Sequence, residues 1–197
     1  MRREELNELH YIVLINNVPS ICSVGILSHN RAKRASHMSF ASPAMQQRRQ
    51  TKKVPGGLAL HDYVNLYFSA RNKALRSISH RHRELCILRI DADILDLPGA
   101  VVTDQNAASE YARFMPASTG LQIVEEDLVF AERWTHPNDT IMEWRHGSIT
   151  CAEVLIPERI APGFLLGAYV SCDASLGQFN ALRVHLAATV NQYLFFV

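Results

Sequence analysis

Six short apolar runs of strand type, spread along the whole chain, limit the fold of this sequence most strongly. They lie at residues 11–15, 60–68, 85–90, 100–103, 149–156 and 165–171. Within residues 60–68, Val64, Leu66 and Phe68 alternate with other residues, as is typical of a half-buried strand. Helices are expected at residues 18–24, 104–114, 122–134 and 176–196. These elements predict an α+β fold with a largely antiparallel, twisted sheet and flanking helices.

The length of 197 residues, with 48% hydrophobic residues, predicts a single domain over residues 1–197. The sequence has no run of eighteen apolar residues and no apolar stretch typical of a secretory signal, so we expect no membrane span and a cytoplasmic location. The four cysteines are widely spaced without a C-x-x-C motif, so we expect reduced thiols that serve in packing.

Charge is strongly separated along the chain, although the formal net charge is only +1. Residues 9–83 contain twelve Lys and Arg residues and one acidic residue, whereas residues 84–197 contain six basic and fifteen acidic residues. Such asymmetry indicates a polyanionic partner for the basic half. Residues 29–57 lack apolar periodicity and predict a long functional loop with a helical turn near residues 44–49.

Several common catalytic motifs are absent from the sequence. It has no P-loop, no Rossmann glycine motif, no H-E-x-x-H and no G-x-S-x-G. His80, His82 and Cys86 match no standard ligand spacing, and their neighbours are cationic, so we expect no metal site.

Glu153 is the only charged residue in the apolar run 149–157. A carboxylate in such a strand needs a buried partner or a chemical function, because an isolated buried charge is costly. An exposed position on one face of an edge strand explains the pattern equally well. The pattern alone leaves both interpretations open.

Five ordered motifs, in one register from about Tyr11 to Cys172, resemble those of the DarT family. They are residues 17–21 followed by 25–28, Ser42-Pro43 leading to Arg48-Arg49, residues 60–68, residues 104–109 and residues 152–157. This family contains the DNA ADP-ribosyltransferase toxins of bacterial toxin–antitoxin systems. The resemblance implies an ADP-ribosyltransferase-like split sheet, and transfer of ADP-ribose from NAD+, the substrate, to a base in single-stranded DNA. In the thymidine-modifying branch this base is thymine.

The resemblance implies that Glu153 is the catalytic acid. A carboxylate there can stabilise the oxocarbenium-like state formed when the nicotinamide–ribose bond breaks. It also assigns a catalytic role to Arg49 rather than Arg48, at the NAD+ pyrophosphate or at the acceptor base. The alternative is that Arg48, Arg49, Lys52 and Lys53 form a solvated basic patch.

The resemblance also implies a dinucleotide site after the first strand. The candidate NAD+ contacts are His10, Tyr11, Asn17, Gly25, Leu27, Ser28, Tyr63 and Tyr67. Leu27, Tyr63 and Tyr67 are equally well explained as core residues, and Gly25 as the residue that ends a helix.

Single-stranded DNA needs cations along its phosphates and flat surfaces for its bases. The main candidates are Arg48, Lys53, Arg71, Lys73, Arg76, Trp144, Arg145 and His146, with Arg34 and Phe40 in the loop. The resemblance implies that residues 134–150 present the acceptor.

Three functional hypotheses follow. The first is a DNA ADP-ribosyltransferase toxin with a cognate antitoxin, such as a macrodomain ADP-ribosyl-hydrolase. The second keeps NAD+ as the substrate but transfers ADP-ribose to RNA or protein. The third is a non-enzymatic nucleic-acid-binding module, which explains the basic loops but not Glu153.

Overall fold

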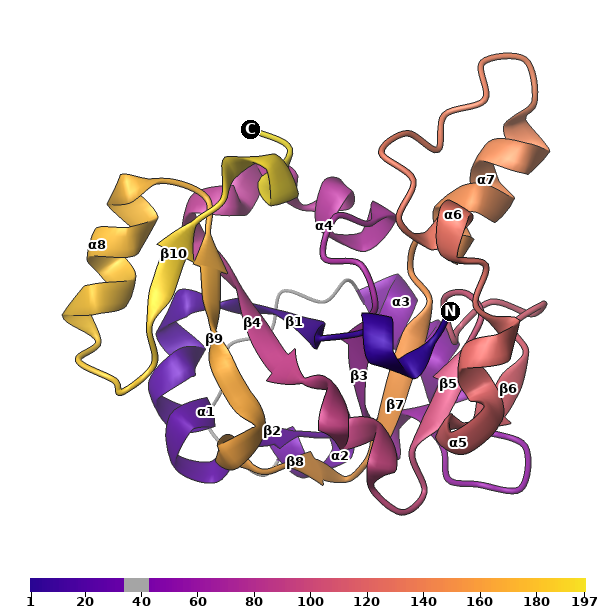
Figure 1. Cartoon of the computed structure of the whole chain (residues 1–197), viewed down its shortest axis with the longest axis horizontal. Helices are drawn as coiled ribbons and strands as arrows, with labels where there is room; N and C mark the ends of the chain where they lie inside the picture. Colours follow the sequence, from indigo (N-terminus) through magenta and orange to yellow (C-terminus); the bar gives the residue numbers. More distant parts are fainter. Residues whose placement is uncertain (34–42) are drawn as a thin grey trace.

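The computed structural model describes residues 1–33 and 43–197 (Figure 1). The described residues do not include Arg34 and Phe40, which are candidate DNA contacts in the basic loop, or Ser42, which belongs to the motif before Arg49. The strands are β1 (Glu8–Leu14), β2 (Ile26–Leu27), β3 (Tyr63–Tyr67), β4 (Leu85–Asp91), β5 (Val101–Thr103), β6 (Phe114–Pro116), β7 (Glu153–Pro157), β8 (Arg159–Ile160), β9 (Leu165–Val170) and β10 (Ala188–Val190).

The α-helices are short. They are α1 (Val18–Val24), α2 (His29–Ala32), α3 (Pro43–Gln50), α4 (Lys73–Ser77), α5 (Ala117–Gly120), α6 (Glu126–Val129), α7 (Thr140–Ile149) and α8 (Asp173–Ala181). The 3₁₀ helices are η1 (Arg3–Glu5), η2 (Ile15–Asn17), η3 (Leu60–Asp62), η4 (Ser79–Glu84), η5 (Ala92–Asp96), η6 (Leu121–Ile123), η7 (Pro162–Phe164) and η8 (Gln192–Phe195). No helix in the described ranges is both long and apolar enough to cross a membrane.

Eight strands of the described chain form one sheet in the order β10-β9-β4-β1-β3-β7-β5-β6, which runs from left to right in Figure 1. All neighbours are antiparallel except β9 and β10. In this part of the chain β1 pairs with β4 at seven register positions but with β3 only at His10↔Tyr67. The sheet is therefore split between β1 and β3, and the predicted split, largely antiparallel α+β fold is confirmed.

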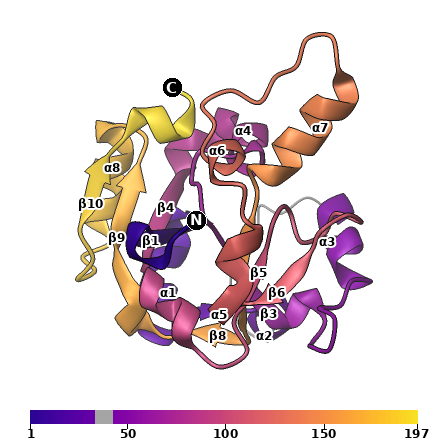
Figure 2. The same ribbon diagram turned by 45° about the vertical axis from the view of Figure 1, so that its right-hand side comes forward.

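The two faces of the sheet carry different side chains, because successive residues of a strand point to opposite faces. Leu9, Leu66 and Val154 lie on the face that forms the largest apolar cluster, which also takes in residues of α1, α5 and α8. Ile12 and Ile87 lie on the other face and pack against Leu75 of α4 and Phe195 of η8. Figures 1 and 2 show α7 and the loop before it projecting beyond this body.

The structure corrects five predicted elements. Residues 104–113 form an irregular loop rather than a helix, because Asp104 accepts hydrogen bonds from the backbone and side chain of Arg113 at 2.9 and 2.6 Å. The helix predicted at 122–134 is confined to α6. The strand predicted at 149–156 begins only at Glu153, since Ile149 ends α7.

The fourth correction concerns the predicted terminal helix at 176–196. Helix α8 ends at Ala181, and Arg183 adopts a left-handed backbone conformation with φ of 53°. Beyond it, Val184, Leu186 and Ala188 pack against the core with a period of two. This alternation favours the strand β10 over a continued helix. Residues 29–57, predicted as a loop with one helical turn, contain the full helices α2 and α3.

Glu8 joins three strands on the sheet face that also carries Ile12. Its carboxylate accepts hydrogen bonds from Arg89 of β4 at 2.6 Å and from the Tyr169 hydroxyl of β9 at 3.0 Å, and it contacts the His10 ring at 3.2 Å. Burial alone would raise the pKa of Glu8, but the hydrogen bonds from His10 and Arg89 outweigh it and lower the pKa to about 2.

The low pKa of Glu8 predicts a loss of stability in acid. Because the folded-state pKa lies below the unfolded value of 4.5, the carboxylate stabilises the fold above pH 4.5, and this contribution disappears as the pH falls toward 2. After allowance for solvent screening of this partly exposed carboxylate, we expect a contribution of roughly 2 kcal/mol at pH 7. Urea unfolding at pH 7, 4.5 and 3 should show a flatter pH dependence for Glu8→Gln than for the wild type, and no such change for the exposed Glu4→Gln control.

Gly25 ends α1 and leads into β2, and its geometry predicts that no larger residue fits there. Its φ is +86°, its N–H donates to the Ile21 carbonyl at 2.8 Å, and an added Cβ would lie 2.1 Å from the Ile160 carbonyl oxygen. We expect Gly25→Ala to cost at least about 2 kcal/mol in denaturant unfolding. Gly56→Ala is the matched control, because Gly56 also has a positive φ but faces open space. Equal losses for both variants would contradict the steric explanation.

Candidate active site

His10, Tyr67 and Glu153 lie side by side across the split in the sheet. His10 is opposite Tyr67, and Tyr67 is opposite Glu153. Residues directly opposite one another on paired strands point to the same face. The three side chains therefore form one row, with Glu153 at the first residue of β7.

Glu153 is fully buried and is paired with Arg49 of α3. The Arg49 guanidinium donates from both terminal nitrogens to the carboxylate, with three N···O distances of 3.2 Å. Arg49 is itself only 9% exposed. The alternative of an exposed edge-strand carboxylate is excluded for Glu153, as is a solvated patch for Arg49. Arg48, its neighbour in the sequence, is exposed.

Backbone groups of the loop after β5 complete the surroundings of Glu153. The Ala107 N–H donates to Glu153 Oε1 at 3.1 Å, and the Glu153 N–H donates to the Thr103 hydroxyl at 3.1 Å. The Thr103 hydroxyl in turn donates to the Gln105 carbonyl at 2.7 Å. The irregular path of residues 104–109 thus brings a backbone donor to the carboxylate, which a helix there would not do.

The electrostatics of the site keep both Arg49 and Tyr67 protonated. Burial alone would lower the pKa of Arg49, but the charge and hydrogen bonds of Glu153 raise it above its usual value. Burial, and secondarily the charge of Glu153, raises the pKa of Tyr67 well above 10. The site therefore offers a cationic guanidinium and a neutral phenol beside one carboxylate.

Several buried polar atoms have no hydrogen-bond partner among residues 1–33 and 43–197. Those near this centre include His61 Nε2, in η3, Ser28 Oγ, at the start of α2, and Gln46 Oε1, in α3. The ring of His29 packs on the ring of His61 with centroids 4.1 Å apart, which joins the two elements. Burial, together with the charges of Arg49 and Lys33, lowers the pKa of His61. Unsatisfied buried polar atoms of this kind are available to a ligand.

The predicted NAD+ contacts fall into two groups. Asn17, Gly25, Leu27 and Ser28 follow one another from η2 through α1 and β2 to the start of α2, and His10 and Tyr67 lie in the row with Glu153. Tyr63 is 5% exposed and packs with Val54, Leu60 and Leu155, which favours its interpretation as a core residue. Tyr11 packs against the opposite apolar cluster, and burial raises its pKa to about 12.

Predicted DNA contacts on α4 and α7 lie where these two helices meet, whereas Arg48 and Lys53 lie on and after α3. The Lys73 side chain lies against Gly147, and its backbone N–H donates to the Thr150 hydroxyl at 3.2 Å. The exposed candidates are Arg48, Lys53, Lys73, Arg76, Trp144 and Arg145, while Arg71 is half-buried.

His146 differs from the other candidates because it is buried. Its Nδ1 contacts His136 Nε2 at 3.0 Å and its Nε2 donates to the Leu128 carbonyl at 3.1 Å. Both ring nitrogens are therefore held by protein groups.

Sequence reasoning assigned no role to Ala107, Thr103 or His61. Ala107 and His61 lie inside two of the DarT-like motifs, residues 104–109 and 60–68. Their position within these motifs is the only sequence feature that points to a role in the site. Thr103 lies just before the first of them. In the described part of the chain, no group of three or more His, Cys, Asp or Glu side chains is placed to hold a metal ion.

A family model described as "ssDNA thymidine ADP-ribosyltransferase, DarT" matches residues 10–193. A DNA ADP-ribosyl transferase–DNA ADP-ribosyl glycohydrolase fusion protein of Thermosipho africanus (strain H17ap60334) is 28% identical over 173 residues, covering 83% of this chain and 42% of the fusion protein. A DNA ADP-ribosyl transferase of Thermus sp. (strain 2.9) is 30% identical over 146 residues, covering 68% of this chain and 69% of that protein. The chain thus spans less than half of the fusion protein's length.

Solved structures agree in fold. Thermus sp. 2.9 DarT in complex with ADP-ribosylated single-stranded DNA aligns with a TM-score of 0.84 at 21% identity, over 96% of both chains. The same protein in complex with NAD+ aligns with a TM-score of 0.77 at 19% identity, over 96% of this chain and 98% of that one. Because the family model spans nearly the whole sequence, the chain belongs to the DarT family.

Proposed function

We propose that this chain transfers ADP-ribose from NAD+ to a base in single-stranded DNA, with thymine as the target. The observation that carries the proposal is the fully buried Glu153, held by Arg49 and the Ala107 N–H beside Tyr67. Its support includes membership of the DarT family and the complexes of Thermus DarT with NAD+ and with ADP-ribosylated DNA. Residues 1–197 act as one domain in the cytoplasm.

In the proposed reaction the bond between nicotinamide and C1′ of the ribose breaks, and nicotinamide leaves with the electron pair. The ribose ring then carries oxocarbenium-like positive charge, which the Glu153 carboxylate stabilises. A base nitrogen of the DNA attacks C1′ and forms the new N–C1′ bond, and the proton of that nitrogen passes to water. The Ala107 N–H and Arg49 fix the carboxylate in place, so that little reorganisation is needed as the charge develops.

Arg49 acts in this proposal as a cation and not as a general base. Its partner Glu153 raises its pKa, and an arginine is already almost never deprotonated in proteins. A protonated guanidinium next to the catalytic carboxylate can neutralise the NAD+ pyrophosphate or the charge on the acceptor base. Ser28 and His61 supply unsatisfied polar atoms for the rest of the dinucleotide.

ADP-ribosylated DNA, the product of the proposed reaction, would be reversed by a partner that hydrolyses the ADP-ribose from the base. The Thermosipho relative joins a DNA ADP-ribosyl transferase to a DNA ADP-ribosyl glycohydrolase in one protein. This chain matches 42% of that protein. From the composition of that relative we propose a toxin whose cognate antitoxin is an ADP-ribosyl-hydrolase of the macrodomain type.

The proposed function predicts a covalent product that depends on Glu153. Incubation of the protein with NAD+ and short oligonucleotides should add the mass of one ADP-ribose to a thymine-containing single strand. Glu153→Gln preserves the shape of the side chain and an oxygen that can accept from Ala107, so it should fold but lose at least about a hundredfold in rate. Mass spectrometry reads both results. Near-wild-type modification by Glu153→Gln, or a product only on RNA or protein, would overturn the assignment.

Arg49 and Arg48 form a matched pair for testing the basic helix α3. Arg49→Ala leaves a buried carboxylate without its cation, so we expect a melting temperature lower by on the order of 10 °C, and loss of both NAD+ hydrolysis and DNA transfer. Adding Glu153→Gln to Arg49→Ala should restore part of the stability but no activity. Arg48→Ala should retain the wild-type melting temperature. Equal small losses in the two single variants would instead favour a simple basic patch.

A further inference from the structure

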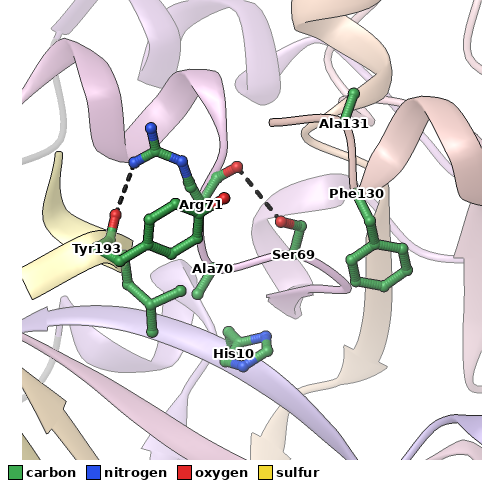
Figure 3. A pocket seen from close by; sticks show the side chains of 8 residues that line it. His10, Ser69, Ala70, Arg71, Phe130, Ala131 and Tyr193 are labelled. Atoms are coloured by element: carbon green, nitrogen blue, oxygen red, sulfur yellow. Dashed lines mark hydrogen bonds between the residues drawn. The ribbon is translucent and has the colours of Figure 1, made fainter. Parts of the chain in front are cut away.

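A hollow of about 180 Å³ opens on the sheet face that carries His10 (Figure 3). It lies between η8 near the C-terminus, the segment that follows β3, and the loop before α7. The residues that line it are His10, Ser69, Ala70, Arg71, Phe130, Ala131, Tyr193 and Leu194. Only His10 and Arg71 among these eight residues belong to sites predicted from sequence.

The hollow lies beyond one end of β3, and the unsatisfied polar atoms of Ser28 and His61 lie toward the other end. Ser69 to Arg71 follow the last residue of β3, whereas His61 precedes its first residue and packs on α2. Glu153 pairs with Tyr67, near the end of β3 that faces the hollow. His10, in the wall of the hollow, is two strands away from Glu153, which corresponds to roughly 10 Å. This separation is about the length of one nucleotide, so a base next to the modified base could occupy the hollow. The hollow lies on the side of the carboxylate away from Ser28 and His61.

The walls of the hollow combine aromatic rings with a cation. Phe130 is 46% exposed and Tyr193 is 51% exposed, and Figure 3 shows them on opposite sides of the opening. The Arg71 guanidinium lies 4.4 Å from the centre of the Tyr193 ring and 4.0 Å from that of Phe196, and donates to the Tyr193 carbonyl at 2.6 Å. Its buried Nε has no hydrogen-bond partner within the described residues.

The hydrogen-bonding groups of the other lining residues are already engaged. His10 contacts the Phe68 carbonyl and the Glu8 carboxylate through its two ring nitrogens, and Ser69 Oγ donates to the Arg71 carbonyl at 3.3 Å. Binding in the hollow thus relies on flat apolar contact and positive charge more than on reading a specific base edge. Stacking of this kind beside arginine is how single-stranded nucleic acid is held with little sequence preference.

We propose that this hollow receives a nucleobase next to the modified base, stacked between Tyr193 and Phe130, with Arg71 near its phosphate. This inference rests on the proposed function, since it supplies the acceptor side of the same site. Lys73 and Arg76 are exposed on α4, which begins two residues after Arg71. They extend the positive surface along which the single-stranded DNA would lie. The hollow holds the acceptor strand in register, while the site at Glu153 carries out the transfer.

The experiment measures the KM for a thymine-containing oligonucleotide with Tyr193→Ala, Phe130→Ala and Tyr193→Phe. We expect the two alanine variants to raise this KM roughly tenfold and Tyr193→Phe to restore it, because the phenylalanine ring still stacks. Leu166→Ala, which shortens an exposed side chain on β9 outside the hollow, is the control and should leave the KM unchanged. Melting temperatures check that each variant is folded.

A second arm uses oligonucleotides with one abasic position on either side of the modified base. For one of these two oligonucleotides, the abasic position should raise the KM of the wild type as much as Tyr193→Ala raises it for the intact oligonucleotide. With the same abasic oligonucleotide, Tyr193→Ala should cause no further rise in KM. An unchanged KM in both alanine variants, or additive losses at every abasic position, overturns the proposal. So does a parallel fall in NAD+ hydrolysis measured without DNA, which would indicate general damage. If the wild type yields no DNA product, the proposed function itself fails, and fluorescence anisotropy with the same oligonucleotides still decides whether the hollow binds a base.

Discussion

The buried ion pair between Glu153 and Arg49 is the interaction on which the arrangement of the site depends. Removing two charges from water is costly, and this cost is offset only when both are well paired and hydrogen-bonded. Glu153 satisfies the condition with the guanidinium and the Ala107 N–H, which come from α3 and from the loop after β5. Three segments far apart in the sequence are therefore held together at one carboxylate.

The split in the sheet lies beside this buried carboxylate and separates two groups of surrounding elements. Among the described residues β1 and β3 are paired only at His10 and Tyr67, near the end of β3. Different elements therefore surround the two ends of β3, and they can serve different parts of a reaction. Ser28 and His61, with their unsatisfied polar atoms, lie toward its beginning, and the hollow beside Arg71 lies beyond its end. The separated charges of the chain fit this division, since Arg49 is buried with Glu153 while Lys73 and Arg76 remain exposed.

Sequence patterns predicted the sheet and the two central residues better than the surrounding loops. The apolar pattern around Glu153 left an exposed position open, and the register of an ordered set of motifs singled out both Glu153 and Arg49. The structure pairs the two side chains, and their catalytic roles belong to the proposed function. Helices were overpredicted where tertiary contacts decide the backbone: Asp104 binds Arg113 instead of capping a helix, and Trp134 packs on the edge of the Phe196 ring with centroids 5.8 Å apart. The role of the Ala107 N–H had no side-chain signal at all, because any residue except proline provides it.

The buried His146 shows how the acceptor side is kept in place. Its ring joins α7 to the Leu128 carbonyl and to His136, so the segment that carries Phe130 is fixed at Leu128 and at His136, on either side of that ring. Gly147, one residue further, allows the Lys73 side chain of α4 to lie against α7. The aromatic wall of the hollow and the cations after β3 are consequently attached to the same helix. His146, a predicted DNA contact, is thus buried in the structure, and its ring links α7 to the segments that carry Leu128 and His136.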